Sequence, residues 1–158
     1  ALSRRGLTND DIRSFARALS ELGEEAQQHG TALSLHHHYD QPVMYRPDFD
    51  VFFDTVDDQT VGLTVDTAHL VKSGINDVAG VIRDFRHVID NFHLKDFSRG
   101  EWCVLGRGDI DFAPIFAAIR SIDYDGWLSA DEESGSELLD AMQLCHQYIE
   151  AALAQKVA

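Results

Sequence analysis

The sequence predicts an α/β fold in which four parallel strands alternate with the helices that cover them. Three observations support this prediction: strand-like and helix-like stretches alternate along the chain, each strand-like stretch is apolar on one residue parity, and no low-complexity tract or Pro-rich linker interrupts the 158 residues. A chain of this length forms about one domain with a sizeable core. We therefore expect residues 1–158 to form one unit, a helix followed by four strand-helix units.

Local patterns place the elements in order. Thr8 and Asp11 have the spacing of a capping box, and apolar residues then recur at helical spacing as far as Gly30, which favours a helix end. The strands are predicted at about 32–38, 61–66, 88–95 and 126–131. The other helices are predicted at about 47–56, 76–87, 112–122 and 136–155. The aromatic residues that we expect to pack among these elements are Phe112, Phe116, Trp127 and Tyr148.

Charge and composition exclude several classes of partner. The 13 Lys and Arg residues against 27 Asp and Glu give a formal net charge of -14, which repels phosphate backbones, so no nucleic-acid partner is expected. No apolar run approaches the roughly 18 residues of a membrane span, and no signal segment opens the sequence, so we expect a cytoplasmic protein with no membrane partner. Cys103 and Cys145 lack a CxxC spacing and indicate neither a zinc knuckle nor a disulfide framework.

Three consecutive histidines end the first predicted strand, in the stretch LSLHHHYD at 33–40. Successive side chains of a strand point to opposite faces, so His36 and His38 share one face with Ser34, while His37 points to the other. A functional pair would therefore be His36 and His38.

The other predicted strands repeat this division into two faces. The apolar parity comprises Leu33 and Leu35, Leu63 and Val65, Phe92 and Leu94, and Leu128 and Ala130. The residues of the opposite parity are small or polar, and the last of them in each strand suits metal binding or acid-base chemistry. These last residues lie at the carboxyl ends of the strands, where TIM-barrel enzymes build their active sites. The residues that we expect to converge there are His36, Asp66, His93 and Asp131.

Two histidines and two carboxylates suit Mn, Co, Zn or Fe(II), and carboxylate-rich versions of such a site admit Mg. Taken singly, a histidine or aspartate at a strand end more often forms a hydrogen bond or caps a helix. The same position and parity on four successive strands argue against that interpretation for the whole set.

Four motifs, in this order and spacing, resemble the xylose isomerase-like TIM-barrel superfamily: VDTAHL at 65–70, FHLKD at 92–96, VLGRGDIDF at 104–112 and GWLSADEE at 126–133. That superfamily includes sugar-phosphate isomerases and epimerases, inosose dehydratases and endonuclease IV-type enzymes. The histidine run resembles the form found in the inosose dehydratase-like branch. The resemblance covers nearly the whole chain and implies the C-terminal half of a (β/α)8 TIM barrel. Four strands cannot close a barrel, so we expect the C-terminal part of a longer protein or a half-barrel that associates with a second copy or another chain.

The resemblance also implies roles for the strand-end residues. Asp66 and His93 match metal ligands, whereas His36 and Asp131 stand where relatives often carry glutamate, and Glu133 is an alternative to Asp131. Mn is the expected metal, with Co, Mg or Zn as alternatives. His69 resembles a substrate-contacting histidine, and its alternative role is helix capping.

Three further residues are candidates for contact with the substrate or an intermediate. Lys95 binds an anion or enolate or, alternatively, pairs with a neighbouring acid such as Asp96. Arg107, in a Gly-Arg-Gly turn, presents its guanidinium to a hydroxyl or phosphate oxygen or lies in a solvated turn. His38 completes the expected substrate-binding set with His69 and Arg107, and the expected catalytic set is His69, Lys95 and Asp131.

The expected chemistry is a metal-dependent isomerisation, epimerisation or dehydration of a sugar or cyclitol through an enediolate. The departures from glutamate at His36 and Asp131 favour a dehydratase or isomerase of a keto-sugar or inosose, in which His69 or Lys95 handles the proton. An endonuclease IV-like phosphodiesterase is an alternative that the charge of -14 disfavours. A non-catalytic half-barrel is another.

Overall fold

The structure is a computed structural model that describes residues 3–154, so the last residue of the helix expected at 136–155 lies outside the described part. Its main sheet has the order β1-β2-β3-β6, and each neighbouring pair is parallel. The strands are β1 Leu33–His36, β2 Val61–Asp66, β3 Ile89–Leu94 and β6 Leu128–Ala130. The prediction of four parallel strands is confirmed.

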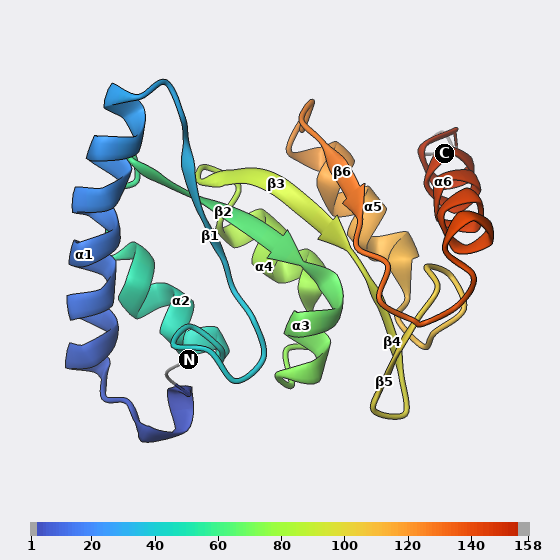
Figure 1. Cartoon of the computed structure of the whole chain (residues 1–158), viewed down its shortest axis with the longest axis horizontal. Coiled ribbons are helices and arrows are strands. Elements are labelled where there is room, and N and C mark those ends of the chain that lie inside the picture. Colours follow the sequence, from blue (N-terminus) through green and yellow to red (C-terminus); the bar gives the residue numbers. More distant parts are fainter. Residues whose placement is uncertain (1–2, 155–158) are drawn as a thin grey trace.

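The register of the sheet places the polar strand-end residues beside one another. His36 pairs with Thr64, Asp66 pairs with His93, and His93 pairs with Ser129 on the far strand. Figure 1 shows that β2 and β3 run together toward the region where α3 and the β4–β5 hairpin follow them. The carboxyl ends of the strands therefore meet at one edge of the sheet.

The predicted helices are present, with somewhat shorter bounds for the later ones. Helix α1 Asn9–Gln28 begins at a capping box formed by Thr8 and Asp11, and the chain leaves it through Gly30, whose φ of 72° favours glycine. The later predicted helices are α2 Arg46–Phe53, α4 Val78–Asp84, α5 Phe112–Ser121 and α6 Leu138–Ala154.

Three short elements were not predicted. The 3-10 turn η1 Arg4–Gly6 precedes α1, and helix α3 Thr67–Lys72 follows β2 without a loop. An antiparallel hairpin of β4 Asp96–Ser98 and β5 Glu101–Cys103 follows β3. Both α3 and the hairpin begin where the candidate site lies.

The apolar parity of the strands forms the core, as the sequence predicts. Leu63, Val65 and Phe92 are fully buried and pack in one cluster with the apolar faces of the helices. Phe112 and Phe116 are also buried, and Tyr148 packs partly buried beside them. The prediction that Trp127 is a packing residue is wrong: its side chain is 83% exposed, because it precedes β6 at the edge of the sheet.

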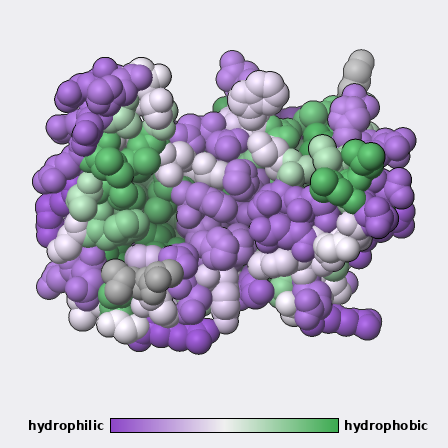
Figure 2. Space-filling view, viewed as in Figure 1, coloured by the Kyte–Doolittle hydropathy of each residue, from purple (hydrophilic) through white to green (hydrophobic). Residues whose placement is uncertain are grey.

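The surface seen in Figure 2 is hydrophilic over its centre and apolar toward both flanks. On α6 the large exposed apolar side chains are Leu138, Leu139, Met142, Leu144 and Leu153, and on α1 Leu22 is about half exposed. None of the described helices combines the length and the apolar character that a membrane crossing needs.

Candidate metal and substrate site

Three of the four predicted metal ligands come together at the ends of adjacent strands. His36, Asp66 and His93 each offer one ligand atom, and these atoms all lie within 4.8 Å of one another. His36 Nε2 lies 3.4 Å from Asp66 Oδ2, and the centroids of the two histidine rings are 4.5 Å apart. Small side-chain rotations would let all three atoms bind one ion, whose bonds to nitrogen and oxygen are about 2.1 Å long.

The two carboxylate oxygens of Asp66 have different surroundings. Oδ1 accepts the backbone N–H of His69 at 2.9 Å and so caps α3, whereas Oδ2 faces His36. Burial opposes ionisation, but the hydrogen bonds from His36 and from the His69 N–H outweigh it and hold the pKa of Asp66 below its ordinary value. An ionised carboxylate with one oxygen turned to the cluster suits a cation.

His93 has a buried ring nitrogen that suits a metal ion. Its Nδ1 atom is buried and has no hydrogen-bond partner within residues 3–154, and the nearest carboxylate oxygen, Asp131 Oδ2, is 3.8 Å away. Burial, and next the neighbouring His36, lower the pKa of His93, so its imidazole is neutral near pH 7. Leaving a buried nitrogen unpaired costs about 1–3 kcal/mol, and a divalent cation would satisfy it.

His37 positions Asp66 through a backbone contact, a role that the sequence does not indicate. Its Nε2 accepts the Asp66 N–H at 3.1 Å, and its ring packs against Phe49 with centroids 5.0 Å apart. Burial lowers the pKa of His37 to about 3, so it is a neutral acceptor. Strand parity predicts that His37 points away from His36 and His38. Its hydrogen bond to the backbone of Asp66, 29 residues away, could not be predicted from the sequence.

Asp131, the fourth predicted ligand, forms an ion pair with Lys95 and does not join the cluster of three. The Lys95 ammonium donates to Asp131 Oδ2 at 3.1 Å and to Glu133 Oε2, and the lysine side chain is only 1% exposed. Burial alone would lower the pKa of Lys95, but hydrogen bonds to Glu133 and Asp131 outweigh it and raise the pKa. The hydrogen bond from Lys95 lowers the pKa of Glu133. Lys95 therefore carries its charge.

The alternative that Lys95 pairs with an acid is confirmed, but that acid is not the adjacent Asp96. The Asp96 carboxylate is fully buried and accepts backbone N–H groups of the Gly-Arg-Gly turn instead, from Gly106 at 3.0 Å and Gly108 at 2.8 Å. Consecutive side chains of an extended segment point in opposite directions, so Lys95 and Asp96 serve different sides of the chain.

His38 and His69 stack on each other next to the cluster. Their ring centroids are 3.5 Å apart, and the His69 ring lies 6.0 Å from that of His36. His69 Nδ1 accepts the Tyr39 N–H at 3.4 Å, so its Nε2 carries the proton in the neutral ring. Burial lowers the pKa of His69 to about 4. Its side chain does not cap α3, since the cap is Asp66.

Arg107 is the predicted site residue that the structure leaves apart from the others. Its side chain is exposed in the turn beside α6, near Leu144 and Tyr148, and it makes no hydrogen bond or ion pair with any described residue. Its contact with a substrate stays a prediction.

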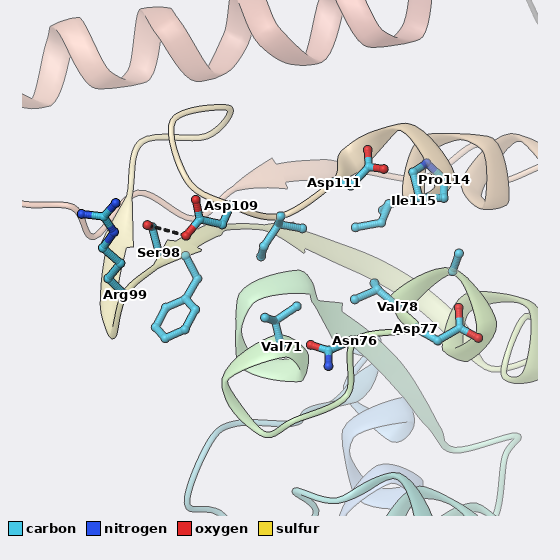
Figure 3. Close-up of a pocket in the computed structure, with 13 residues that line it drawn as sticks. Val71, Asn76, Asp77, Val78, Ser98, Arg99, Asp109, Asp111, Pro114 and Ile115 are labelled. Carbon is cyan, nitrogen blue, oxygen red and sulfur yellow. Dashed lines mark hydrogen bonds between the residues drawn. The ribbon is translucent and has the colours of Figure 1, made fainter.

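A cavity of about 520 Å³ lies elsewhere, between the segment after α3, the hairpin and the start of α5. Figure 3 shows its carboxylates, with Asp109 accepting a hydrogen bond from Ser98 at 2.6 Å. None of the predicted site residues lines this cavity.

Comparisons with known proteins establish the family. Residues 3–151 match the model described as xylose isomerase-like TIM barrel, so the chain belongs to that family. It is 28% identical over 156 residues to an inosose dehydratase of Clostridium perfringens, covering 87% of this chain and 52% of the relative. An inosose dehydratase of Clostridium botulinum is 30% identical over 157 residues, with 85% and 52% covered. The chain thus spans about half the length of the curated relatives it matches.

Solved structures of low sequence identity share the fold. A probable 3-DHS dehydratase of Bacillus anthracis superposes with a TM-score of 0.80 at 17% identity, over 93% of this chain and 59% of the other. An L-ribulose 3-epimerase gives 0.76 at 23% identity, over 93% and 55%. The IOLI protein, solved with a bound zinc atom, gives 0.78 at 16% identity, over 100% and 62%. The predicted fold class, the C-terminal half of a (β/α)8 TIM barrel, is confirmed.

Proposed function

We propose that this chain contributes the metal site and the proton-handling groups of an enzyme that isomerises, epimerises or dehydrates a sugar or cyclitol through an enediolate. The observation that carries the proposal is the cluster of His36, Asp66 and His93, in which the buried Nδ1 of His93 has no hydrogen-bond partner among residues 3–154. Membership of the xylose isomerase-like family and the inosose dehydratases among its relatives support it.

In this proposal His36, Asp66 and His93 hold a divalent metal, Mn in the first instance, while Asp131, which pairs with Lys95, lies beside them. Such a cation would polarise neighbouring carbonyl and hydroxyl oxygens of a polyol and so acidify the adjacent C–H bond. The donor set of two imidazoles and one carboxylate equally suits Co or Zn.

Two neighbouring residues have protonation states that suit them to the oxygens of the substrate. Lys95 is charged, and its ammonium can donate to a developing oxyanion on the substrate. His69 is neutral near pH 7, and its Nε2–H can donate to a substrate hydroxyl or carbonyl. His38 lies against His69, with the ring centroids 3.5 Å apart and the planes tilted by 37°, and so limits the movement of that ring.

Asp131 is the proton-handling carboxylate in this scheme. It lies between Lys95, at 3.1 Å, and His93, at 3.8 Å, and its side chain is 26% exposed, so a substrate can reach it. In this scheme the Asp131 carboxylate would take the proton from the carbon next to the carbonyl and return it to a second carbon, or to a departing hydroxyl that then leaves as water. We therefore favour a dehydratase or isomerase of a keto-sugar or inosose.

The test is exchange of carbon-bound hydrogen, a step that all three reactions share. Keto-sugars and inososes are incubated in D2O with the protein and Mn, and proton NMR follows the C–H signal next to the carbonyl. We expect the signal to disappear with the wild-type protein and to persist with Asp66→Asn. Asparagine keeps the oxygen that caps α3 but removes the charge.

The matched control is Asp111→Asn, since Asp111 also caps a helix, α5, and lies outside the site. This variant should exchange at the wild-type rate. A metal-loaded wild-type protein that exchanges none of the substrates would contradict the proposal, as would an Asp66→Asn variant that is as active as the wild type.

A further inference from the structure

Lys72, the last residue of α3, holds its ammonium against three aromatic rings. Its Nζ lies 3.9 Å from the centroid of Trp102, 5.3 Å from that of Tyr39 and 5.5 Å from that of Phe97. We call Tyr39, Phe97 and Trp102 the aromatic cage. Cation–π attraction holds the ammonium in place but accepts none of its three N–H donors in line.

The Lys72 ammonium has no acidic partner in the part of the chain that the structure describes. No carboxylate of residues 3–154 forms an ion pair with it, and no oxygen there accepts its hydrogen bonds, although the sequence carries 27 Asp and Glu. The other lysine near the site, Lys95, has two carboxylate partners. A half-buried ammonium left without an acceptor in so acidic a protein is suited to an anion that comes from outside.

The position of Lys72 relates this ammonium to the metal cluster. His69 and Lys72 are three residues apart on α3 and so share a helix face, about 4.5 Å apart along the axis. Trp102 contacts both, because its ring centroid lies 4.9 Å from that of His69 and 3.9 Å from Lys72 Nζ. Lys72 therefore lies one helical turn beyond the residue that adjoins His36.

A second cation, Arg5, lies on the surface side of Lys72 and contacts the same aromatic cage. Arg5 donates to the Tyr39 hydroxyl at 2.8 Å, and its guanidinium lies 5.8 Å from the Tyr39 ring centroid. Arg5, Lys72 and Lys95 thus alternate with Tyr39 and Trp102 from the surface to the site. Arg5 also pairs with Asp40 at 3.7 Å, and Lys95 pairs with two carboxylates, so Lys72 is the cation of this row that has no acidic partner among the described residues.

We propose that Lys72 binds an oxyanion of the substrate, a carboxylate or a phosphate, at the end of the molecule remote from the metal. This inference rests on the proposed function and narrows its substrates to those sugars or cyclitols that carry a charged group. A neutral hydroxyl would leave the ammonium uncompensated, whereas an oxyanion forms charge-assisted hydrogen bonds with it. The aromatic cage fixes the direction of the ammonium, so that its free N–H groups meet the ligand.

Three probes that differ only at C6 test the inference: D-fructose, D-fructose 6-phosphate and D-fructuronate. Their affinities are measured calorimetrically with the full chain at saturating Mn, for the wild type, Lys72→Met and Lys72→Arg. Methionine keeps an unbranched chain against Trp102, and arginine restores the charge. Arg13→Gln, on the outer face of α1, removes one exposed charge away from the site and serves as the control.

We expect one of the charged probes to bind the wild type about ten-fold or more tightly than D-fructose. Tighter binding of D-fructose 6-phosphate would identify the oxyanion as a phosphate, and tighter binding of D-fructuronate would identify it as a carboxylate. The preference should fall below about two-fold in Lys72→Met, recover in part in Lys72→Arg and persist in Arg13→Gln, since charge-assisted bonds depend on the local ammonium.

Equal affinities of the three probes for the wild type would overturn the inference, and so would a preference that survives in Lys72→Met. Binding of none of them to metal-loaded protein would overturn it too. Each sample is first titrated with Mn, and the probes are compared only in samples shown to bind it. A failure of the metal site is thereby distinguished from a failure of the inference about Lys72.

Discussion

The three consecutive histidines have three different environments, although they are chemically identical. His36 ends β1 and points into the cluster, His37 turns to the helices and accepts the Asp66 N–H, and His38 stacks on His69. Strand alternation accounts for the opposite directions of His36 and His37. A triplet at this strand end therefore supports Asp66 from two sides.

The stability of the metal-free protein should fall as pH decreases below about 6.5, in part through His37. Its folded-state pKa of about 3 lies below the value of 6.5 for a free histidine, so the unfolded chain binds the extra proton between these values. Stability is thus present above pH 6.5 and is lost as pH falls toward 3. One such group gives a slope approaching about 1.4 kcal/mol per pH unit.

Urea unfolding of the wild type and His37→Gln between pH 7 and pH 5 measures this slope. Glutamine offers an oxygen in place of Nε2 and does not titrate, so its unfolding free energy should depend less on pH. Equal slopes for the two proteins would show that His37 is not the titrating group.

Residue contacts were predictable from the sequence only where strand geometry fixes them. The convergence of His36, Asp66 and His93 follows from parity and parallel register. The partners of Lys95 cannot be predicted in this way, because Asp131 and Glu133 come from the segment after β6, 36 and 38 residues along the chain. Sequence neighbours such as Asp96 are poor guides to ion pairs across a sheet.

Among the elements, the Gly-Arg-Gly turn is organised by one carboxylate. Asp96 accepts N–H groups of Gly106, Gly108 and Ile110 in addition to that of Phe97. A Cβ atom on Gly108 would lie 2.2 Å from Asp96 Oδ1, so glycine is needed for this close approach. The turn that carries Arg107 is therefore fixed to the start of β4.

Replacing Asp96 with asparagine should loosen this turn and destabilise the fold by about 2–3 kcal/mol, since an amide NH2 would face backbone N–H donors. Chemical denaturation measures the loss, and hydrogen exchange should show faster exchange at residues 104–110. Asp109→Asn, on the exposed rim of the same turn, is the matched control. Unchanged exchange in Asp96→Asn would refute the structural role of Asp96.

Helix α3 and the β4–β5 hairpin were not predicted, for a physical reason, whereas the three-residue strand β6 was, because its residues repeat the parity of the other strands. Helix α1 and strand β2 carry enough residues to show a period, and β2 occupies the predicted 61–66. Helix α3 has six residues and the hairpin strands have three each, too few for a period. These short elements are formed by tertiary contacts, such as the capping of α3 by Asp66.

At the scale of the whole molecule, the sheet has two strands that pair on one side only within residues 3–154, β1 and β6. The apolar flanks of Figure 2 lie beyond these edges, over α1 and α6. Open edges and exposed apolar side chains both promote association.

We therefore expect the chain to associate in a concentration-dependent way. Sedimentation velocity should show a weaker association after Leu139→Gln together with Met142→Gln, because these side chains are 80% and 54% exposed on α6. Leu153→Gln, near the other end of α6, is the comparison variant. A wild-type chain that stays monomeric at all concentrations would contradict this expectation.

We propose that His36, Asp66 and His93 bind one divalent cation, and a calorimetric titration with Mn tests this proposal directly. We expect about one site per chain in the wild type and an affinity at least ten-fold lower in Asp66→Asn and in His93→Gln, since loss of even an outer-shell partner costs about ten-fold or more. Asp111→Asn should match the wild type. Absence of binding by the wild type, or equal affinity in all four proteins, would contradict the claim.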